Sequence, residues 1–520
     1  MKADFDIAVV GSGFAGSLTA MIARQLGHSV VLIERGRHPR FAIGESSTPL
    51  ANLLLEELAR RYELPALLPL TKWGPWQKAH PEIACGLKRG FTFFHHSFGN
   101  AWKPRADRGN ELLVAASPHD GIADTHWYRP HFDEFLARQV AKLGVELLEE
   151  TSLDAADFTQ ASPVLTGSRH RKPLSLRVQF VIDASGPRGF LHRALGMEET
   201  GFDTMPASQA LYSHFEGVRR WDSLHVTGEP PYPVDDAAMH HVFDGGWIWV
   251  LRFNNGVTSA GVAADSALGG ELRFADGAPA WERLLARLPS VREQFAPARP
   301  TLPFVHAPRL AFRASAAAGP NWALLPSAAG FVDPLLSTGF PLTLLGVERL
   351  ANALAMAWNT PKLPALLQDY SAVTLRELDV TAELIGALYS HMADFEVFAA
   401  LTVLYFAAAS YSETARRLEK PEAARRFVLQ DREEFAAAWK RLLAAARGPV
   451  VGEARRQLLS GVAAAIEPIN VAGLADAKRN NWYPALAEDL IAAAPKLGVD
   501  RAAIDRLLAR CGFTASSAFL

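Results

Sequence analysis

A glycine-rich turn near the start of the chain has the composition of a phosphate-binding loop. Gly11, Gly13 and Gly16 follow a short apolar run rich in β-formers, Phe5–Val10, and precede a stretch with helical spacing of apolar residues. Gly11 permits the tight turn, Gly13 lets the backbone approach a pyrophosphate, and Gly16 allows a helix to pack closely on a strand. A second apolar strand ends in Glu34, whose carboxylate suits ribose hydroxyls. This spacing predicts a dinucleotide site; the alternative is a structural turn with a solvated acid.

One such motif is found, and no second nicotinamide-type motif accompanies it, which favours a single resident dinucleotide, FAD. The turn Asp183–Gly186 follows another buried strand, 180–184, and could place a second strand end against the same cofactor. The alternative for Asp183 is a turn cap, a common role for aspartate.

The elements that must position these residues alternate between strands and helices. Helices are predicted over 17–26, 49–61 and 132–143, and strands over 29–33, 90–95, 180–184 and 322–326. Residues 190–305, including 240–253 and 257–262, indicate short antiparallel strands and turns, and the chain is mostly helical from Leu350 onward.

The predicted fold class is α/β: a Rossmann-like FAD-binding domain with an interleaved antiparallel-sheet substrate domain and a helical C-terminal region. We expect the FAD-binding domain to comprise residues 1–80, 129–190 and 305–360. The substrate-binding sheet domain would comprise 81–128 and 191–304, and the helical C-terminal domain 361–520.

Composition excludes several classes of protein. The 520 residues carry 53 basic and 55 acidic side chains, so no global field directs the chain to nucleic acid or an anionic membrane. Cys85 and Cys511 are too few for a disulfide framework or a four-cysteine zinc site, which favours a cytoplasmic protein. The apolar stretch 397–409 is too short to span a bilayer. His240 and His241 would face opposite sides of a strand, so we expect no metal site.

Several segments together resemble the flavin-dependent halogenases, which belong to the wider group of flavin monooxygenases. Phe331–Gly339 reads FVDPLLSTG and fits the family pattern FxxPxxSxG in full, and Trp247-Ile248-Trp249 matches the first part of its WxWxIP signature. The resemblance covers roughly residues 1–360. The other matching segments are Gly11–Gly16, Glu34, Gly44–Pro49, Arg129 with its following helix, and Asp183–Gly186.

The resemblance implies that reduced FAD, dioxygen and halide give hypohalous acid, and that a lysine presents the halogen to an electron-rich aromatic ring. Lys88, in a Lys-x-Gly segment before an aromatic strand, is the candidate for this catalytic lysine. Burial beside Phe91, Phe93 and Phe94 would lower its pKa from about 10.4. The alternative, weighed equally on the residues alone, is a solvated strand edge.

The halide would bind the backbone amides of Thr338 and Gly339. A turn of successive amides makes an anion site, and Pro334 would fix the loop shape. The alternative is an ordinary Pro/Gly loop. The apolar composition of the loop and its place between a buried strand and an apolar helix count against this alternative.

The remaining candidates follow from the same motifs. Cofactor-binding residues are expected to be Gly11, Gly13, Phe14, Ala15, Gly16, Glu34, Arg35, Gly44, Glu45, Ser46, Arg129, Asp183, Gly186, Asp333, Pro334 and Phe340. The substrate pocket is expected to include Phe93, His95, Glu111, Trp247, Trp249 and Leu336, with His96, His126 and Tyr128 as further hydrogen-bonding candidates. In the family the two tryptophans lie near the flavin; simple core packing is the alternative.

Three departures from the family pattern bear on the substrate and on the flavin contacts. Leu251-Arg252 replaces the Ile-Pro that would complete WxWxIP, and Pro326-Ser327 replaces a Gly-Asp whose carboxylate binds the ribityl chain. Leu336 stands where tryptophan halogenases carry a glutamate, so free tryptophan is a poor substrate and the phenol-type branch is favoured.

The first hypothesis is therefore an FAD-dependent halogenase acting with chloride or bromide on a free phenolic substrate. The alternatives are a flavin monooxygenase or other oxidoreductase of the same fold, and a non-catalytic flavoprotein. Expected partners are a small aromatic substrate and a separate flavin reductase, with no nucleic acid and no membrane, for a monomer or homodimer.

Overall fold

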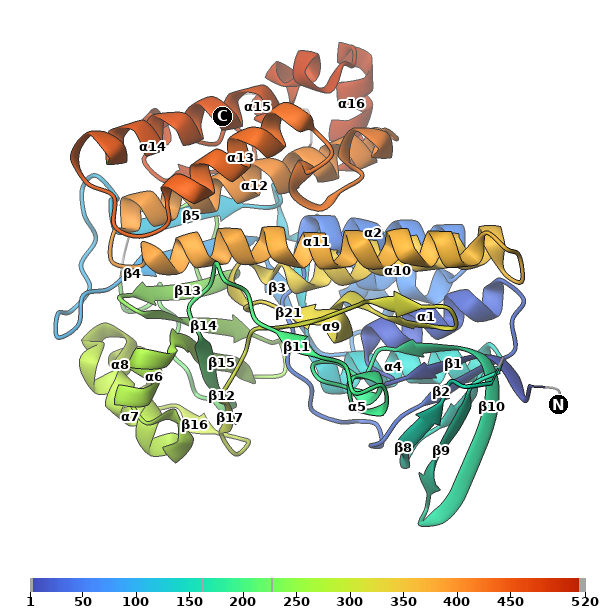
Figure 1. Cartoon of the computed structure of the whole chain (residues 1–520). Helices are drawn as coiled ribbons and strands as arrows, with labels where there is room; N and C mark the ends of the chain where they lie inside the picture. The colour runs from blue at the N-terminus through green and yellow to red at the C-terminus, as the bar shows by residue number, and fades with distance from the viewer. Residues whose placement is uncertain (1–2, 161, 226–227, 514–520) are drawn as a thin grey trace.

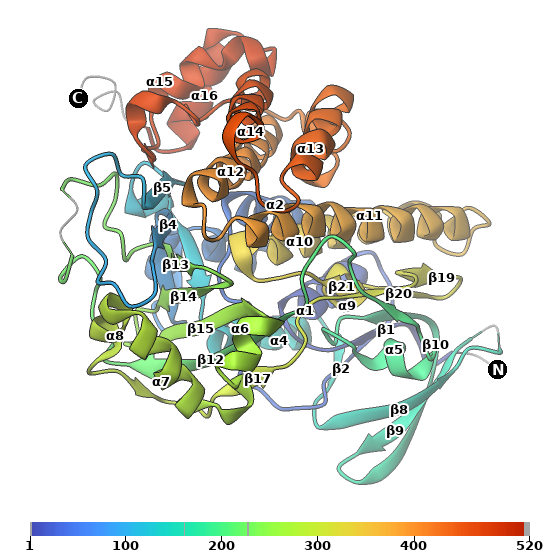
Figure 2. The ribbon, with the colours of Figure 1, turned by 60° about the vertical axis from the view of Figure 1, so that its left-hand side comes forward.

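The computed structural model describes residues 3–160, 162–225 and 228–513. Two β-sheets lie side by side, and the long helices α10 (Gly339–Ala357) and α11 (Leu363–Ser390) cross over them (Figure 1). The C-terminal helices α12 to α16 form a further layer above these two, as a view from another side also shows (Figure 2).

The first sheet has the parallel pairing of a Rossmann fold. Its order is β19-β20-β10-β1-β2-β7, in which β20, β10, β1, β2 and β7 run parallel and the β8–β9 hairpin extends β10. Val10 pairs with both Ile33 and Asp183, so three strands end at one edge. The strands are β1 (Phe5–Val10), β2 (Val30–Ile33), β7 (Glu146–Leu148), β8 (Thr151–Asp157), β9 (Val164–Arg169), β10 (Lys172–Asp183), β19 (Ala318–Gly319) and β20 (Trp322–Leu324).

The second sheet is mainly antiparallel and follows the order β16-β12-β15-β14-β13-β4-β5-β22, with β17 also on β12. Its exceptions are the parallel pairs β13–β4 and β5–β22. A separate hairpin-like pair, β3 and β6, and a small sheet β11-β18-β21 complete the strands. Their bounds are β3 (Cys85–Lys88), β4 (Gly90–His95), β5 (Glu111–Ala115), β6 (Asp124–Trp127), β11 (Glu199–Thr200), β12 (Ser208–Glu216), β13 (Ala238–Phe243), β14 (Gly246–Arg252), β15 (Thr258–Asp265), β16 (Arg299–Pro300), β17 (Val305–Ala307), β18 (Phe312–Ala314), β21 (Gly330–Phe331) and β22 (Trp482–Tyr483).

The helices connect and cover these sheets. Beyond α10 and α11 they are α1 (Phe14–Gln25), α2 (Pro49–Arg61), α3 (Trp73–Ala79), α4 (Arg129–Lys142), α5 (Phe190–Ala194), α6 (Ser266–Glu271), α7 (Ala278–Arg287), α8 (Pro289–Phe295), α9 (Pro326–Ala329), α12 (Phe395–Arg417), α13 (Glu433–Ala445), α14 (Gly452–Ile466), α15 (Ala487–Ala492) and α16 (Arg501–Arg510). The α/β fold class predicted from the sequence is confirmed. Helices α5 to α8 interrupt the segment 190–305, for which sequence patterns predicted short strands and turns.

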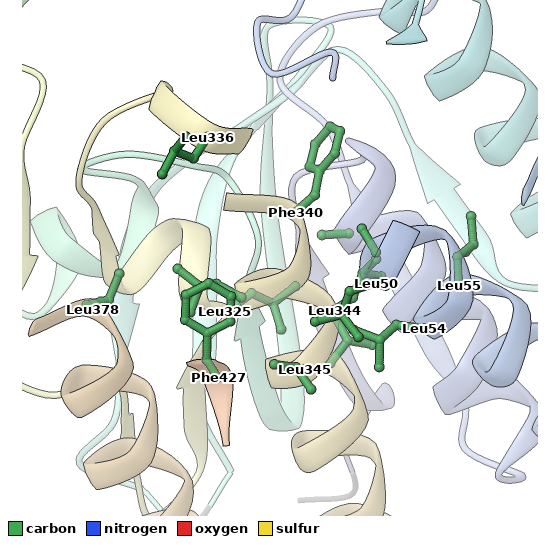
Figure 3. Packing of buried hydrophobic residues seen from close by; sticks show 14 of the residues in the cluster. Leu50, Leu54, Leu55, Leu325, Leu336, Phe340, Leu344, Leu345, Leu378 and Phe427 are labelled. Atoms are coloured by element: carbon green, nitrogen blue, oxygen red, sulfur yellow. The ribbon is translucent and has the colours of Figure 1, made fainter. Parts of the chain in front are cut away.

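The main hydrophobic core lies between the Rossmann sheet and the crossing helices. Leucines from α2 and α10 interdigitate there, and Phe340 at the start of α10 packs at the edge of the same cluster (Figure 3). Thr48 caps α2 by accepting a hydrogen bond from the amide of Ala51, and Pro49 occupies its first turn, where a missing amide hydrogen has no cost.

Helix α12 has the length and hydropathy of a membrane span. However, 78% of its most apolar 18-residue stretch is buried inside the protein, as in the core helix of a globular protein. It packs against α2 and α14, which accounts for its apolar composition without a bilayer.

The C-terminal region also contributes to the second sheet, because β22 pairs with β5. Trp482 Nε1 donates a 3.0 Å hydrogen bond to Glu111 Oε1, and the Arg108 guanidinium lies 3.4 Å from the ring centroid of Trp482. Burial raises the pKa of Glu111 to about 7, although the Trp482 hydrogen bond and Arg108 oppose the shift. This carboxyl fastens the C-terminal segment to the sheet.

Replacing Glu111 by glutamine should stabilise the protein at pH 8 and leave its stability little changed near pH 4.5. The folded state holds the Glu111 proton more tightly than the unfolded state, so wild-type stability falls as pH rises from about 4.5 to 7. Glutamine keeps an acceptor for Trp482 and removes this penalty, worth at most about 3 kcal/mol. Thermal unfolding of both proteins across this pH range measures the effect. An equal difference at both pH values would contradict it.

Candidate active site

A cavity of about 840 Å³ runs along the edge where the parallel strands end. Its size lies within the usual range for cofactor pockets. Four segments form most of its wall: the glycine-rich turn, the loop 40–46, the turn 184–190, and the loop before α10. The far end is closed by side chains of the second sheet, including Ala238, His240, Trp247, Trp249 and Leu251.

The glycine-rich turn has the shape that its sequence predicts. Gly11 has a φ of 99°, and a Cβ there would lie 2.7 Å from the carbonyl oxygen of Ala184. A Cβ on Gly16 would lie 1.9 Å from the carbonyl oxygen of Gly11, so α1 could not pack this closely on the turn. Gly13 lies against the Arg129 side chain at the cavity wall.

Glu34 sits at the end of β2 and holds the turn in place. Its Oε2 accepts hydrogen bonds from the Ser12 amide at 3.1 Å and the Ser12 hydroxyl at 2.9 Å, and its Oε1 accepts from the Gly36 amide at 2.7 Å. Burial favours a higher pKa for Glu34, but Arg40, 3.0 Å away, and these hydrogen bonds bring the pKa below its ordinary value. The acid is therefore an anion on the cavity wall, as ribose binding requires.

Arg129 begins α4 and fixes the loop that covers the cavity. Its guanidinium makes a two-point contact with Asp133, at 2.8 and 2.7 Å, and donates to the carbonyl oxygens of Ile43 and Gly44. Next to it, Glu45 Oε1 lies 2.7 Å from His214 Nε2 of the second sheet. Both contacts tie the loop to rigid elements on opposite sides.

Of the predicted residues at the end of β10, one has a structural role and the other lines the cavity. Asp183 lies behind the wall, where its carboxylate accepts hydrogen bonds from the amides of Ser185 and Leu191 and from the Ser185 hydroxyl. Asp183 is thus a turn cap, the alternative weighed for it in the sequence. Gly186 lines the cavity with a φ of 85°.

The loop before α10 presents backbone amides to the cavity. Leu336 and Ser337 have φ values of 63° and 55°, and the chain then enters α10 at Gly339. Thr338 and Gly339 line the cavity, and first-turn amides of a helix have no acceptor within it. A Cβ on Gly339 would meet no atom within 4 Å. Successive amides in such a turn are the kind of group that can bind an anion, and Leu336 is buried with the core residues (Figure 3).

Asp333 anchors this loop through a network that sequence patterns did not reveal. Its Oδ1 accepts from Trp247 Nε1 at 3.3 Å and from the Leu335 amide at 3.0 Å, and its Oδ2 accepts from the Tyr389 hydroxyl at 2.9 Å. Burial raises the pKa of Asp333 to about 6 against these hydrogen bonds. Tyr389 belongs to α11, outside any recognised motif, so only the folded chain brings it here.

Lys88, at the end of β3, is fully buried. Its ammonium donates to the Ser46 hydroxyl at 2.9 Å and to the Ser47 carbonyl oxygen, and it lies 3.8 Å from the ring centroid of Phe91. Gly86 lets β3 lie close to β14, because a Cβ on Gly86 would lie 1.9 Å from the Arg252 carbonyl oxygen. The solvated-edge alternative for Lys88 is wrong.

Asp124 lies directly across from Lys88 in the β3–β6 pair. Desolvation lowers the pKa of Lys88 despite this carboxylate, and it raises the pKa of Asp124 despite the ammonium. Desolvation likewise lowers the pKa of His126 and His240 to about 3, with Lys88 contributing to both shifts. The two histidines are therefore neutral near pH 7, and Asp124 is the carboxyl whose charge acts on Lys88.

A second cavity, of about 160 Å³, lies beyond the Phe91 ring that contacts Lys88, and Lys88 itself is in the lining of neither cavity. Phe91 and Asp124 line it, whereas Ser46 and His240 line the first cavity. Lys88 contacts both Ser46 and Phe91, which places it in the wall between the two. Most of the second cavity's remaining surface comes from α12 and from the segment 471–513.

The predicted substrate-pocket residues are distributed differently. Trp247 and Trp249 line the first cavity. The others line neither cavity: Phe93 stacks on His240, His95 stacks on Phe395, Glu111 binds Trp482, and Leu336 is buried in the core. The further candidates His96, His126 and Tyr128 also lie outside both linings. Local patterns could not anticipate the α12 and C-terminal residues that form the second cavity.

Two sequence departures have structural explanations. Leu251 lines the first cavity and Arg252 turns away from it, with its Nε 2.9 Å from Asp235 Oδ1. Pro326 and Ser327 begin α9 and both line the first cavity, so Ser327 offers a hydroxyl where the wider flavin group has a carboxylate. Among the residues that the structure describes, no group of three or more potential ligands is placed to hold a metal ion.

Comparison with known proteins agrees with this geometry. A sequence profile of the tryptophan halogenase family matches residues 124–441, more than half of the chain, and a profile of NAD(P)-binding Rossmann-like domains matches residues 9–55. Monodechloroaminopyrrolnitrin halogenase PrnC of Pseudomonas fluorescens is 27% identical over 408 residues, covering 77% of this chain and 70% of that protein. Tetracycline 7-halogenase of Kitasatospora aureofaciens is 29% identical over 385 residues, covering 71% and 65%.

The solved structure of halogenase PltM superimposes with a TM-score of 0.79 at 21% identity, covering 92% of this chain and 99% of that one. PltM in complex with phloroglucinol and FAD gives a TM-score of 0.75 at 21% identity, covering 89% and 94%. These likenesses establish a shared fold.

The Rossmann sheet, the glycine turn and the dinucleotide-sized cavity define a flavin-dependent oxidoreductase. The chain belongs to the tryptophan halogenase family and is an FAD-dependent halogenase. The first cavity fits FAD, and its lining includes the glycine turn and Glu34 as well as Trp247 and the loop at Thr338. Bound and reduced, FAD supplies the oxygen chemistry that oxidises halide.

Replacing Glu34 by glutamine should weaken FAD binding by about 10-fold or more, because an acceptor that is charged at neutral pH loses its charge. The change also loosens the Ser12 and Arg40 contacts that shape the turn. Titration of FAD followed by the quenching of its fluorescence measures the affinity. Asp157→Asn, an exposed acid on the β8–β9 hairpin, is the matched control and should bind FAD as the wild type does. Equal affinities of the Glu34 variant and the control would contradict a cofactor-binding role.

Proposed function

We propose that the protein halogenates a free, electron-rich phenolic ring and that Lys88 delivers the halogen. The observation that carries this proposal is the burial of Lys88 between a dinucleotide-sized cavity and a ring-sized one. Hypohalous acid made at the first cavity must reach the second without escaping to solvent, and Lys88 is the polar group placed between them.

The surroundings of Lys88 suit this task. The Lys88 ammonium contacts the Ser46 hydroxyl, the Ser47 carbonyl oxygen and the Phe91 ring. Burial lowers the pKa of Lys88 although Asp124 opposes the shift. Both the ammonium, which hydrogen-bonds hypohalous acid, and the neutral amine, which reacts with it, are therefore accessible near neutral pH.

The size and lining of the second cavity favour a single ring as the substrate. A cavity of about 150 Å³ suffices for benzene, and this one measures about 160 Å³ with walls that include Phe91, Val114 and Phe406. A phenol supplies its own activation, since the hydroxyl donates electron density into the ring. The phloroglucinol complex of PltM, a relative in fold, shows a phenol bound to such a protein.

The other components follow from the first cavity. The amides of Thr338 and Gly339 are the proposed halide site, at the Trp247 end where the flavin ring would lie. Reduced FAD would come from a separate flavin reductase, since the described residues provide one dinucleotide-sized cavity. We place the protein in the cytoplasm, where a reductase and reduced nicotinamide are available.

Lys88→Met should abolish halogenation while leaving the oxidation of reduced FAD within about threefold of the wild type, since the lysine acts after oxygen chemistry. Methionine fills the buried space with a side chain of similar length, so folding should survive. The assay incubates resorcinol with FAD, a flavin reductase, NADH, air and chloride or bromide, and records product mass.

The exposed Lys78 of α3 provides the control, and Lys78→Met should halogenate as the wild type does. A halogen isotope doublet from the wild type that persists in the Lys88 variant would overturn the role of Lys88. A wild-type product heavier by one oxygen, without halogen, would instead indicate a monooxygenase.

A further inference from the structure

Four charged side chains line the second cavity, and three of them are already in ion pairs. Lys72 Nζ lies 3.7 Å from Oε2 of Glu56, which is outside the lining, and Glu413 Oε1 accepts from Arg417 Nε at 2.7 Å. Asp124 differs from these groups because it stands at the Lys88 end of the cavity and only part of its carboxylate is used.

Asp124 is 6% exposed, and its Oδ1 accepts a 2.8 Å hydrogen bond from Asn52 Nδ2. Its Oδ2 is buried without a hydrogen-bond partner among the described residues. A buried carboxylate oxygen without a donor costs several kilocalories per mole and is rare in folded proteins. No direct ion pair to Lys88 satisfies it, although the two side chains face each other across β3 and β6.

The end of the cavity nearest Lys88 therefore has a buried carboxylate with one unsatisfied acceptor oxygen, and the Lys88 ammonium lies behind the Phe91 ring. Phe91, whose ring contacts the Lys88 ammonium, also lines the cavity and offers a flat apolar wall to an aromatic ring. A ring placed there needs a hydrogen-bond donor on its edge to satisfy Asp124, and a phenolic hydroxyl is such a donor.

We propose that Asp124 is a second catalytic residue, which accepts the hydrogen bond of the substrate hydroxyl and takes its proton as the ring attacks the halogen. This inference rests on the proposed function, since it assumes a phenol in the second cavity. Burial raises the pKa of Asp124 to about 7, against the effect of Lys88, which suits a base that works near neutral pH.

The step balances without any further reactant. The ring carbon ortho or para to the hydroxyl attacks the halogen of hypohalous acid held at Lys88, and the halogen–oxygen bond breaks with its electron pair on oxygen. The hydroxyl proton moves to Asp124, which leaves a halogenated dienone. Loss of the ring proton restores aromaticity while Asp124 returns a proton to the oxygen. The departing hydroxide and the ring proton together form water, so the ring is oxidised and the halogen is reduced.

A role confined to tuning Lys88 is the competing explanation, because Lys88 and Asp124 interact electrostatically. The other groups whose charge acts on Asp124 are Glu413 and Arg417, while His126 and His240 near Lys88 are neutral. The two explanations differ in one respect: only a base for the substrate makes the effect depend on the acidity of the phenol.

The test is Asp124→Asn, with kcat/KM measured at one pH for resorcinol and its mono- and difluorinated analogues. Fluorine barely changes the size of the ring but makes its hydroxyl more acidic. Because every analogue is measured at the same pH, the protonation state of Lys88 in a given protein is the same across the series. The kcat/KM of Asp124→Asn should be about 100-fold below the wild-type value on resorcinol. It should approach the wild-type value for analogues that are already ionised in solution. Asn52 Oδ1 has no partner among the described residues, so Asn52 can flip and accept a hydrogen bond from the new amide.

Glu413→Gln is the matched control, a carboxyl change in the same cavity, and its loss should be the same across the series. Thermal unfolding and FAD binding check that each variant is folded. A uniform loss for Asp124→Asn, or no loss, would overturn the role of Asp124 and leave the proposed function intact. Failure of the wild type to halogenate these phenols, or full activity of Lys88→Met, would overturn the proposed function itself.

Discussion

The burial of the Lys88 ammonium is the constraint on which the arrangement of the site depends. An isolated buried charge is costly, and here it is met by a hydroxyl, a carbonyl oxygen and an aromatic face. Each partner comes from a different part of the chain, so the loop 44–48, β3 and β4 must meet at one point. The short β3–β6 pair and the Ser46–His126 bridge hold them there. The same desolvation that makes the site costly shifts the lysine toward the neutral amine.

On the cofactor side of the molecule, a few carboxylates hold the backbone of the loops in fixed positions. Glu34 fixes the glycine turn, Asp133 orients Arg129 onto the covering loop, and Asp333 joins Trp247 to Tyr389 at the loop before α10. Parallel register brings the strand ends to one edge, so these carboxylates act on a common cavity. Most of the lining of the first cavity thus comes from loops that the strands hold in place.

Much of this could be predicted from local sequence, and the reasons for the exceptions are physical. The glycine turn, β1, α2 and β4 follow directly from apolar periodicity and capping residues. Lys88 was a candidate only because its short segment resembles the family's, and the fold shows that its side chain is buried. The second cavity could not be predicted, because its walls come from segments hundreds of residues apart whose patterns indicate only helix packing. Glu111 shows the same limit: a polar residue on a strand can face a pocket or a buried tryptophan, and only the pairing of β22 with β5 decides.

The separation of the two cavities bears on how substrate choice is encoded. The cofactor cavity is formed largely by motif-bearing segments, whereas part of the second cavity is formed by residues 471–513, beyond the region matched by the family profile. In the proposed function, Lys88 and Asp124 lie at the junction of the two cavities and deal with the same electrophile whatever the substrate. The outer wall of the second cavity would then contact only the substrate. On this proposal, changes in the C-terminal segment alter which ring is admitted without disturbing the oxygen and halide chemistry at the first cavity.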